Sequence, residues 1–180
     1  RGWGEEAVGR MGIRAAQKVG EGLSMAMGRE VSRQERAKAC GATDRVAGRG
    51  EEGIAKILEL TQGSGADSVL ECVGTAESRE KAIQVTRPGG MIGYVGVPHG
   101  VQLDGQKIFF SQTGMLGGPA PVRRLLPRPP ELILPRQIDP GNVFDLELPM
   151  PDVAAGYPAV HERRPLTVHL RPVARPLVSR

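Results

Sequence analysis

A glycine-containing stretch near the N-terminus, Gly4-Glu-Glu-Ala-Val-Gly9, has residue types and spacing that could hold a phosphate. It follows the outline of G-x-G-x-x-G, in which glycines let the backbone approach the pyrophosphate of a dinucleotide and let a helix pack on a sheet. Glu6 stands at the middle glycine, where its carboxylate would face the pyrophosphate. Either the match is accidental or the fingerprint has lost part of its function. We predict a true but impaired cofactor-binding motif made of Gly4, Glu6, Ala7, Val8 and Gly9.

A second candidate position lies at the end of the next apolar segment, about 20 residues further along, where this type of fold reads the adenosine ribose. An acidic residue there would accept hydrogen bonds from the ribose 2′-hydroxyl, but the chain has Gly28 and Arg29. A small residue followed by a guanidinium leaves room for a 2′-phosphate and pairs with it. The pair therefore favours NADP over NAD, although an ordinary solvated arginine at a strand end is the alternative.

These motifs need helices and strands to position them, and the first two thirds of the chain alternate between the two patterns. Apolar residues at helical spacing and a capping box from Ser32 to Glu35 predict helices over 8–19, 32–40, 51–61 and 77–86. Short apolar runs predict strands over 23–27, 45–47, 66–74 and 91–97. This alternation predicts an α/β fold of the Rossmann type, a doubly wound parallel sheet.

Composition excludes several other classes. The net charge of +4 is spread along the chain and aromatic residues make up 3%, so no basic run with stacking aromatics predicts nucleic-acid binding. No apolar run approaches the ~18 residues of a membrane span, and no signal-peptide pattern is present. Cys40 and Cys72 are too far apart in the sequence for a metal-binding pair, and we interpret them as reduced thiols. We expect a cytoplasmic protein that binds neither nucleic acid nor membrane.

Five segments carry a resemblance to a known family: GATDRV, GADSVLECVGT, RPGGMIGYVGVPHG, GGPAPVRRLLP and QIDPGNVFDLELPMPDVAAGY. They closely resemble the carboxyl-terminal half of zinc-dependent alcohol dehydrogenases of the medium-chain superfamily, from about Gly4 to Pro172. The resemblance implies a Rossmann domain that binds NAD(P) over 4–133, a segment returning to the catalytic domain over 134–172, and a tail over 173–180. It also implies hydride transfer between an alcohol and a carbonyl, with a small alcohol or aldehyde as substrate only in a full-length parent, and leaves homo-oligomerisation open.

The resemblance also assigns further cofactor-binding positions. Gly4 and Gly9 match the first and third fingerprint glycines, and Gly28 with Arg29 matches the ribose position. Val73 and Gly74 match the end of the family's fourth strand. Loops that line the nicotinamide in such enzymes correspond to Val97, Pro98, Gly117 and Gly118, although Val97 could equally finish a strand.

The sequence departs from the family pattern in three places. The residues that hold the catalytic zinc belong to the amino-terminal half of the family, and His99, His161 and His169 are isolated, so we expect no zinc to be bound by this chain. The apolar first strand is missing before Gly4, and because that strand is central in the order 3-2-1-4-5-6, we expect a gap in the sheet. Prolines after Leu126, among them 129, 130 and 135, should break a helix.

Two kinds of function remain open. The chain is either a fragment of an NAD(P)-dependent alcohol dehydrogenase, or a catalytically silent remnant that binds a nucleotide or a partner. A methyltransferase-like Rossmann domain is disfavoured, because GGPAPVRR and QIDPG would have no role in it. The departures from the family pattern suit a fragment or the product of a decayed or mis-joined gene, and a first residue that is Arg and not Met suggests that the sequence does not begin where translation begins. We expect it to oxidise no alcohol by itself.

Overall fold

The computed structural model describes residues 7–20, 22–28, 31–48, 50–162, 165 and 167–172, with only the backbone of 31–33. Gly4, Glu6 and Arg29 therefore lie outside the described residues. The chain divides into two compact units, Arg1–Pro129 and Pro130–Arg180, which are described separately. The assignment of residues 134–172 to a catalytic domain stays a prediction.

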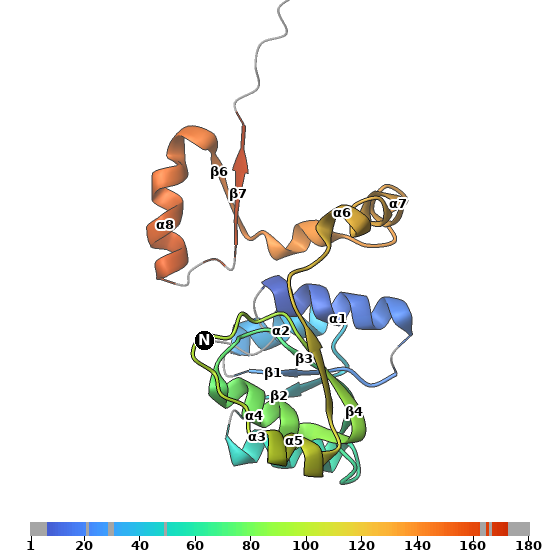
Figure 1. Cartoon of the computed structure of the whole chain (residues 1–180). Helices are drawn as coiled ribbons and strands as arrows, with labels where there is room; N and C mark the ends of the chain where they lie inside the picture. The colour runs from blue at the N-terminus through green and yellow to red at the C-terminus, as the bar shows by residue number, and fades with distance from the viewer. Residues whose placement is uncertain are drawn as a thin grey trace, which may run out of the picture. The chain divides into compact units, whose positions relative to one another are not determined.

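The first unit alternates helices and strands along the chain (Figure 1). Helical spacing of apolar residues and the positive-φ Gly20 match its first helix, which ends where the sequence pattern predicts. The elements are α1 (Ala7–Val19), β1 (Met25–Met27), α2 (Val31–Ala39), β2 (Asp44–Val46), α3 (Glu51–Leu60), β3 (Ala66–Glu71), α4 (Ala76–Val85), β4 (Thr86–Tyr94), α5 (Gly105–Ser111), β5 (Gly114–Gly117) and α6 (Val122–Leu125).

All strand pairs of this unit are parallel, which confirms the predicted fold class. β1 pairs with β2, and β3, β4 and β5 form a second sheet in that order, with β4 in the middle. Among the described residues no ladder joins the two sheets. This division matches the gap in the sheet that the sequence analysis predicts.

The core is built almost entirely from aliphatic side chains, as the shortage of aromatic residues requires. One cluster joins the two sheets through α3 and α4: Met27, Val46, Ile54, Ile57 and Val85. A second cluster packs α4 against the middle strand through Ala82, Ile83 and Ile92. A third, around Ile13 and Cys40, packs α1 and α2 on the first sheet. Side-chain packing therefore holds together two sheets that share no hydrogen-bonded ladder.

Several boundaries differ from the sequence prediction, among them the start of β1 at Met25 and not Leu23, and the end of β4 at Tyr94 and not Val97. β3 ends at Glu71, before the predicted Gly74, because Val73 and Gly74 form the following turn. β4 begins at Thr86 and includes Pro88, because a register irregularity opposite Ala66 and Ser68 accommodates a residue without an N–H. α2 begins at Val31, so Ser32 lies inside the helix and the predicted capping box is wrong.

The predicted helix interruption is present at Leu126 and Pro127, between α6 and α7 (Arg128–Ile133). Pro129 and Pro130 lie in the first turn of α7, where the N–H that proline lacks would have no helical partner. These two prolines therefore start a short helix and do not destroy it. The division between the two units falls within α7.

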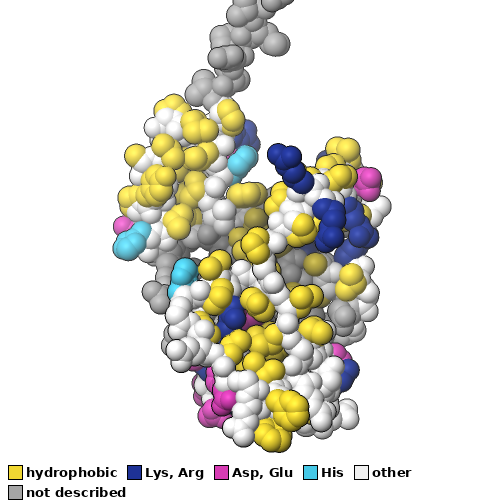
Figure 2. Space-filling view, in the orientation of Figure 1, with side chains coloured by type: hydrophobic (Ala, Val, Ile, Leu, Met, Phe, Trp, Pro, Cys, Tyr) yellow, Lys and Arg dark blue, Asp and Glu magenta, His cyan; other side chains and the backbone are white. Residues whose placement is uncertain are grey.

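The second unit contains a small parallel sheet of β6 (Leu146–Pro149) and β7 (Val168–Arg171). The 3-10 turns η1 (Pro140–Val143) and η2 (Met150–Asp152) flank β6, and α8 (Val153–His161) packs on the sheet. Gly156 of α8 is buried against this sheet, where a Cβ would make an ordinary contact 3.5 Å from Leu148. Hydrophobic side chains gather over α8 at the surface (Figure 2). None of the described helices has the length and apolar character to cross a membrane.

Truncation of Ile92 tests the packing of the middle strand. Its side chain is fully buried against Ala82 and Ile83. Ile92→Ala should lower the free energy of unfolding by about 2 to 5 kcal/mol, because it leaves a cavity in the core. Met91→Ala is the control on the same strand, since Met91 is 48% exposed, and should cost much less. Equal losses for the two variants in urea unfolding would contradict this arrangement.

Candidate functional site

The carboxyl ends of three parallel strands lie side by side at one edge of the larger sheet. The register pairs Glu71 of β3 with Tyr94 of β4, and Tyr94 with Gly117 of β5. The turns that follow these strands therefore leave the sheet at the same level. In doubly wound sheets ligands bind at this edge, which makes it the candidate site.

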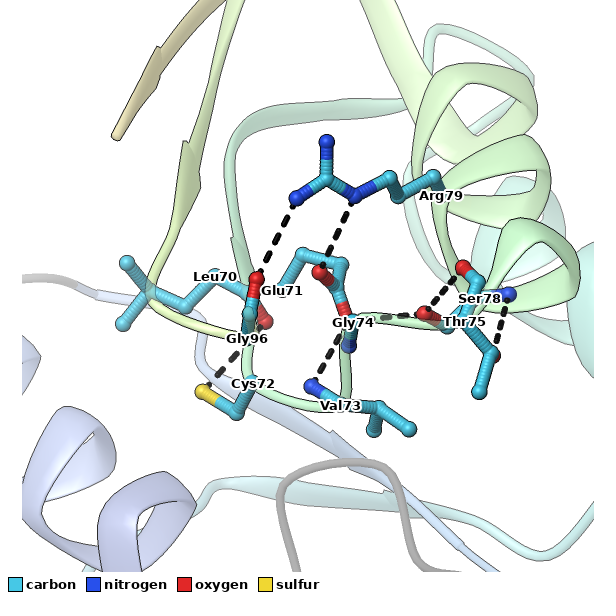
Figure 3. A network of polar contacts seen from close by, with 9 residues as sticks. All are labelled: Leu70, Glu71, Cys72, Val73, Gly74, Thr75, Ser78, Arg79 and Gly96. Carbon is cyan, nitrogen blue, oxygen red and sulfur yellow. Dashed lines mark hydrogen bonds and ion pairs between the residues drawn. The ribbon is translucent and has the colours of Figure 1, made fainter. Parts of the chain in front are cut away.

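Glu71 organises the first of these turns from a buried position (Figure 3). The residue is 1% exposed, and its Oε1 accepts hydrogen bonds from the N–H of Val73 at 2.7 Å and of Gly74 at 2.8 Å. The hydroxyl of Ser78 also donates to Oε1, at 2.7 Å. One carboxylate oxygen thus fixes the turn after β3 and ties it to α4.

Arg79 extends the same network to the turn after β4 (Figure 3). Its Nε lies 3.7 Å from Oε2 of Glu71, and its Nη2 donates to the carbonyl of Gly96 at 3.2 Å. The guanidinium also lies over the ring of Tyr94, 4.2 Å from the ring centroid. Because both charged groups are almost fully buried, each depends on the other for its compensation.

The start of α4 adds two further contacts. Thr75 caps the helix, since its hydroxyl accepts the N–H of Ser78 at 3.2 Å. The Ser78 hydroxyl lies 2.9 Å from the Thr75 carbonyl as well as close to Glu71. On the β4 side, Val95 and Gly96 donate their N–H groups to the Glu71 carbonyl. The turns after β3 and β4 therefore form one hydrogen-bonded unit.

Glycines are required where these turns touch. Gly74 has a φ of +87°, and a Cβ on it would lie 2.2 Å from the carbonyl oxygen of Val97. A Cβ on Gly96 would lie 2.3 Å from the backbone nitrogen of Gly74, and one on Gly117 would lie 2.3 Å from the Tyr94 carbonyl oxygen. Backbone therefore packs directly on backbone across three neighbouring strands, which no larger residue allows.

Six of the predicted cofactor-binding residues are brought together at this edge: Val73, Gly74, Val97, Pro98, Gly117 and Gly118. Val73 and Gly74 belong to the Glu71 network, whereas Val97 is 65% exposed. Pro98, Gly117 and Gly118 are exposed as well. Their cofactor contacts stay predictions.

The other described candidates lie at the first turn of α1 and at the end of β1. Ala7, Val8 and Gly9 open α1, with Val8 exposed and Gly9 buried. Gly28 is buried, donates its N–H to the Val46 carbonyl at 3.0 Å and accepts a hydrogen bond from Gln34 at 2.5 Å. Gly28 is thus fixed by the fold itself, and its predicted ribose contact stays a prediction.

The sequence analysis missed the two residues that hold the edge, Glu71 and Arg79. The only signal was the carboxylate of Glu71 directly after the apolar pair Val69-Leu70, since a carboxylate that becomes buried there is costly unless it has a partner. Arg10 was missed too, although this arginine is 1% exposed in the first turns of α1, next to Gly9.

No group of three or more possible metal ligands is formed by the residues that the structure describes. Cys72 follows Glu71, and burial, with a smaller contribution from the Glu71 charge, raises the pKa of its thiol to about 11. The thiol is therefore neutral at physiological pH, whereas a metal ligand or nucleophile needs the thiolate. These features argue against a chemical role for Cys72.

Comparison with known proteins decides the family. A family model described as zinc-binding dehydrogenase matches residues 7–118. The chain belongs to the zinc-binding dehydrogenase family. A probable zinc-binding alcohol dehydrogenase of Mycobacterium tuberculosis is 32% identical over 96% of this chain and 45% of its own length. An NADP-dependent isopropanol dehydrogenase of Clostridium beijerinckii is 35% identical over 48% of this chain and 24% of its own length.

Solved structures agree with this membership. The alcohol dehydrogenase of a Thermus species superposes with a TM-score of 0.87 at 26% identity, over 93% of this chain and 50% of that enzyme. A zinc-dependent alcohol dehydrogenase of Streptococcus pneumoniae has the same TM-score at 19% identity, which shows the fold alone. The chain spans about half the length of the curated relative and of the structures that it matches.

Removal of either partner of the buried pair tests the Glu71 network. Glu71→Ala and Arg79→Ala should each lower the free energy of unfolding by about 3 to 5 kcal/mol, because each leaves a buried charge without its partner. The double variant should lose less than the sum by about 1 to 3 kcal/mol, because no lone charge remains. Urea unfolding of the four proteins measures this coupling.

Glu147→Ala is the control for this cycle. Glu147 pairs with Arg171 at a site where both side chains are about half exposed or more, so its removal should cost about 0 to 1 kcal/mol. Strictly additive losses at Glu71 and Arg79 would contradict the proposed dependence of one charge on the other.

Proposed function

We propose that this chain is the cofactor-binding half of an NADP-dependent alcohol dehydrogenase and binds the dinucleotide at the carboxyl edge of β3, β4 and β5. Membership of the zinc-binding dehydrogenase family supports an oxidoreductase function. The observation that carries the location is the locked arrangement of the turns after β3 and β4 beside the end of β5. A site fixed before binding loses little conformational freedom when a ligand arrives.

The described residues offer the kinds of group that a dinucleotide needs. Open backbone at Gly117 and Gly118 allows a close approach, since a Cβ on Gly118 would meet nothing within 4 Å. The described part of α1 begins at Ala7 and has 13 residues, and the N-terminus of a helix favours a phosphate. The exposed Val97 supplies an apolar surface of the kind on which a nicotinamide ring could lie. When bound, the cofactor would supply the hydride acceptor.

Zinc, unlike the dinucleotide, finds no suitable ligands among the described residues. The described residues do not gather a ligand set for it, so they do not fit this metal. We therefore propose no substrate-activating step within this chain. Oxidation of an alcohol would require a Lewis acid or base supplied by the part of the relatives that this chain does not match.

The preference for NADP over NAD depends on Gly28 and Arg29. A guanidinium pairs with a 2′-phosphate through charge-assisted hydrogen bonds, and the small glycine leaves room beside it. The Clostridium beijerinckii relative is named as NADP-dependent, which supports the same choice. Calorimetric titration of the full chain with NADP and with NAD tests it, and tighter binding of NAD would overturn it.

Substitution of Arg29 tests the phosphate contact directly. Arg29→Ala should weaken the binding of NADP by about 1 to 3 kcal/mol and leave the binding of NAD nearly unchanged, because only NADP carries the 2′-phosphate. Arg87→Ala is the control, since Arg87 pairs with Asp67 at the opposite end of the sheet. An equal loss of affinity for both cofactors would show that Arg29 does not contact the 2′-phosphate.

Substitution of Glu6 tests the impaired fingerprint. A carboxylate facing a pyrophosphate at ~4 Å should weaken binding by about tenfold to a thousandfold. Glu6→Gly should therefore tighten the binding of NADP, while alcohol oxidation stays undetectable. Glu5→Gly is the neighbouring control and should have a much smaller effect. Unchanged affinity in Glu6→Gly would mean that the motif is misaligned.

The second candidate function is that of a silent remnant, which Glu6 itself favours because of this repulsion. The titrations separate the two. If neither cofactor binds to the original chain or to Glu6→Gly, the chain is not a dinucleotide-binding half. If the original chain reduces NADP with a simple alcohol, the proposed dependence on another half is wrong.

A further inference from the structure

Arg79 links the turns after β3 and β4 from a buried position on α4 (Figure 3). Its Nε lies 3.7 Å from Oε2 of Glu71, and its Nη2 donates a hydrogen bond to the carbonyl of Gly96 at 3.2 Å. Gly96 directly precedes Val97, on which the nicotinamide ring is proposed to lie. We propose that Arg79 is a positioning residue for the nicotinamide half of the dinucleotide, an inference that rests on the proposed function.

Arg79 acts on Val97 through the backbone. The guanidinium is almost fully buried, so it does not itself touch a ligand at this edge of the sheet. The carbonyl of Gly96 and the N–H of Val97 belong to one planar peptide unit, so a donor that holds this carbonyl sets the direction in which the chain enters Val97. Val97 is 65% exposed, and its side chain has little packing to fix it. Its position therefore depends on the backbone that precedes it.

The turns need such a contact because glycines form them. Glycine has more backbone freedom than any other residue, and Gly74 and Gly96 have no side chain with which to anchor their turns. Oε1 of Glu71 accepts the N–H of Gly74, whereas Arg79 holds the carbonyl of Gly96. Side chains on these two glycines would collide with neighbouring backbone. The two buried charges therefore supply the restriction that a side chain at either position would otherwise give.

The geometry of the guanidinium fits a positioning role better than charge compensation alone. An arginine that only neutralises a carboxylate commonly bonds to it directly, through two parallel hydrogen bonds. Here neither Nε of Arg79 nor Oε2 of Glu71 has a hydrogen-bond partner among the described residues. The guanidinium instead bonds to the Gly96 carbonyl and lies over the Tyr94 ring, 4.2 Å from the ring centroid. Its orientation is therefore set by β4 and by the turn that follows β4.

The adenosine half of the cofactor should not depend on these contacts. Its predicted ribose position, Gly28 at the end of β1, donates to the Val46 carbonyl and accepts a hydrogen bond from Gln34. The contacts that orient Arg79 lie instead at the ends of β3 and β4 and in the turn after β4. Loss of the contact to Gly96 should therefore weaken the binding of one half of the dinucleotide and spare the other half.

Arg79→Lys tests this role. Lysine keeps the buried positive charge beside Glu71, but its single ammonium cannot also reach the Gly96 carbonyl as the planar guanidinium does. NADP should bind about tenfold more weakly to this variant, whereas adenosine 2′,5′-bisphosphate, which lacks the nicotinamide, should bind within about twofold of the original chain. Calorimetric titration of the full chain measures both affinities, at a temperature where circular dichroism shows the variant folded. Arg87→Lys is the matched control and should change neither affinity, since Arg87 pairs with Asp67 at the opposite end of the sheet.

The ratio of the two affinities separates positioning from general stability, because a variant that is merely less folded loses affinity for both compounds by the same factor. Equal losses, or no loss for NADP, would overturn the role of Arg79 and leave the proposed function intact. Failure of the original chain to bind NADP would instead overturn the proposed function, and this role with it.

Tyr94→Leu gives a second reading if Arg79→Lys fails to fold. This variant keeps both buried charges and removes the ring over which the guanidinium lies. It should show the same selective loss, with NADP bound about threefold more weakly or less well still and adenosine 2′,5′-bisphosphate nearly unchanged. The same loss for both compounds in Tyr94→Leu would also overturn the role of Arg79.

Discussion

The carboxylate of Glu71 is the constraint on which the candidate site depends. A charged group with almost no exposure is tolerated only where donors and an opposite charge surround it, and Glu71 has three donors on one oxygen and Arg79 near the other. Two of those donors belong to the turn after β3, the third is Ser78 on α4, and the carbonyl that Arg79 contacts belongs to the turn after β4, so satisfying the charge fixes both turns. Such a network restricts the geometry of its members, because losing the contacts to Oε1 would leave a buried charge without donors, whereas Oε2 of Glu71 and Nε of Arg79 meet only as an ion pair.

A second constraint is the division of the sheet. In a continuous parallel sheet the ladders would hold the strands together, whereas here the link between the two sheets is the apolar cluster of Met27, Val46, Ile54, Ile57 and Val85. Hydrophobic packing is not directional, so it can hold the sheets near one another without pairing their edges. The carboxyl edge of β3 to β5, by contrast, is ordered by its own hydrogen bonds.

These two constraints bear on the proposed division between cofactor binding and chemistry. The ordered carboxyl edge is the surface at which we propose that the cofactor binds, and its described residues form no metal-ligand group and hold a thiol whose pKa is raised. The chain belongs to the zinc-binding dehydrogenase family and matches about half the length of its relative. Both facts fit that division. Hydride transfer needs a cofactor held in place and a substrate made reactive, and we assign only the first task to these residues.

The sequence by itself determined the elements and the family. Helical periodicity predicted α1, α3 and α4, and apolar runs predicted β1 to β4, because these signals are local and reflect burial on one face or both. The capping box at Ser32 was wrong and the start of β4 was misplaced, since packing and strand pairing decide where an element begins. Only the tertiary structure revealed Glu71 with Arg79, and why Gly74, Gly96 and Gly117 must be glycines. Those requirements arise when the turns of neighbouring strands meet, and the spacing of residues along one strand does not record which turn lies beside it.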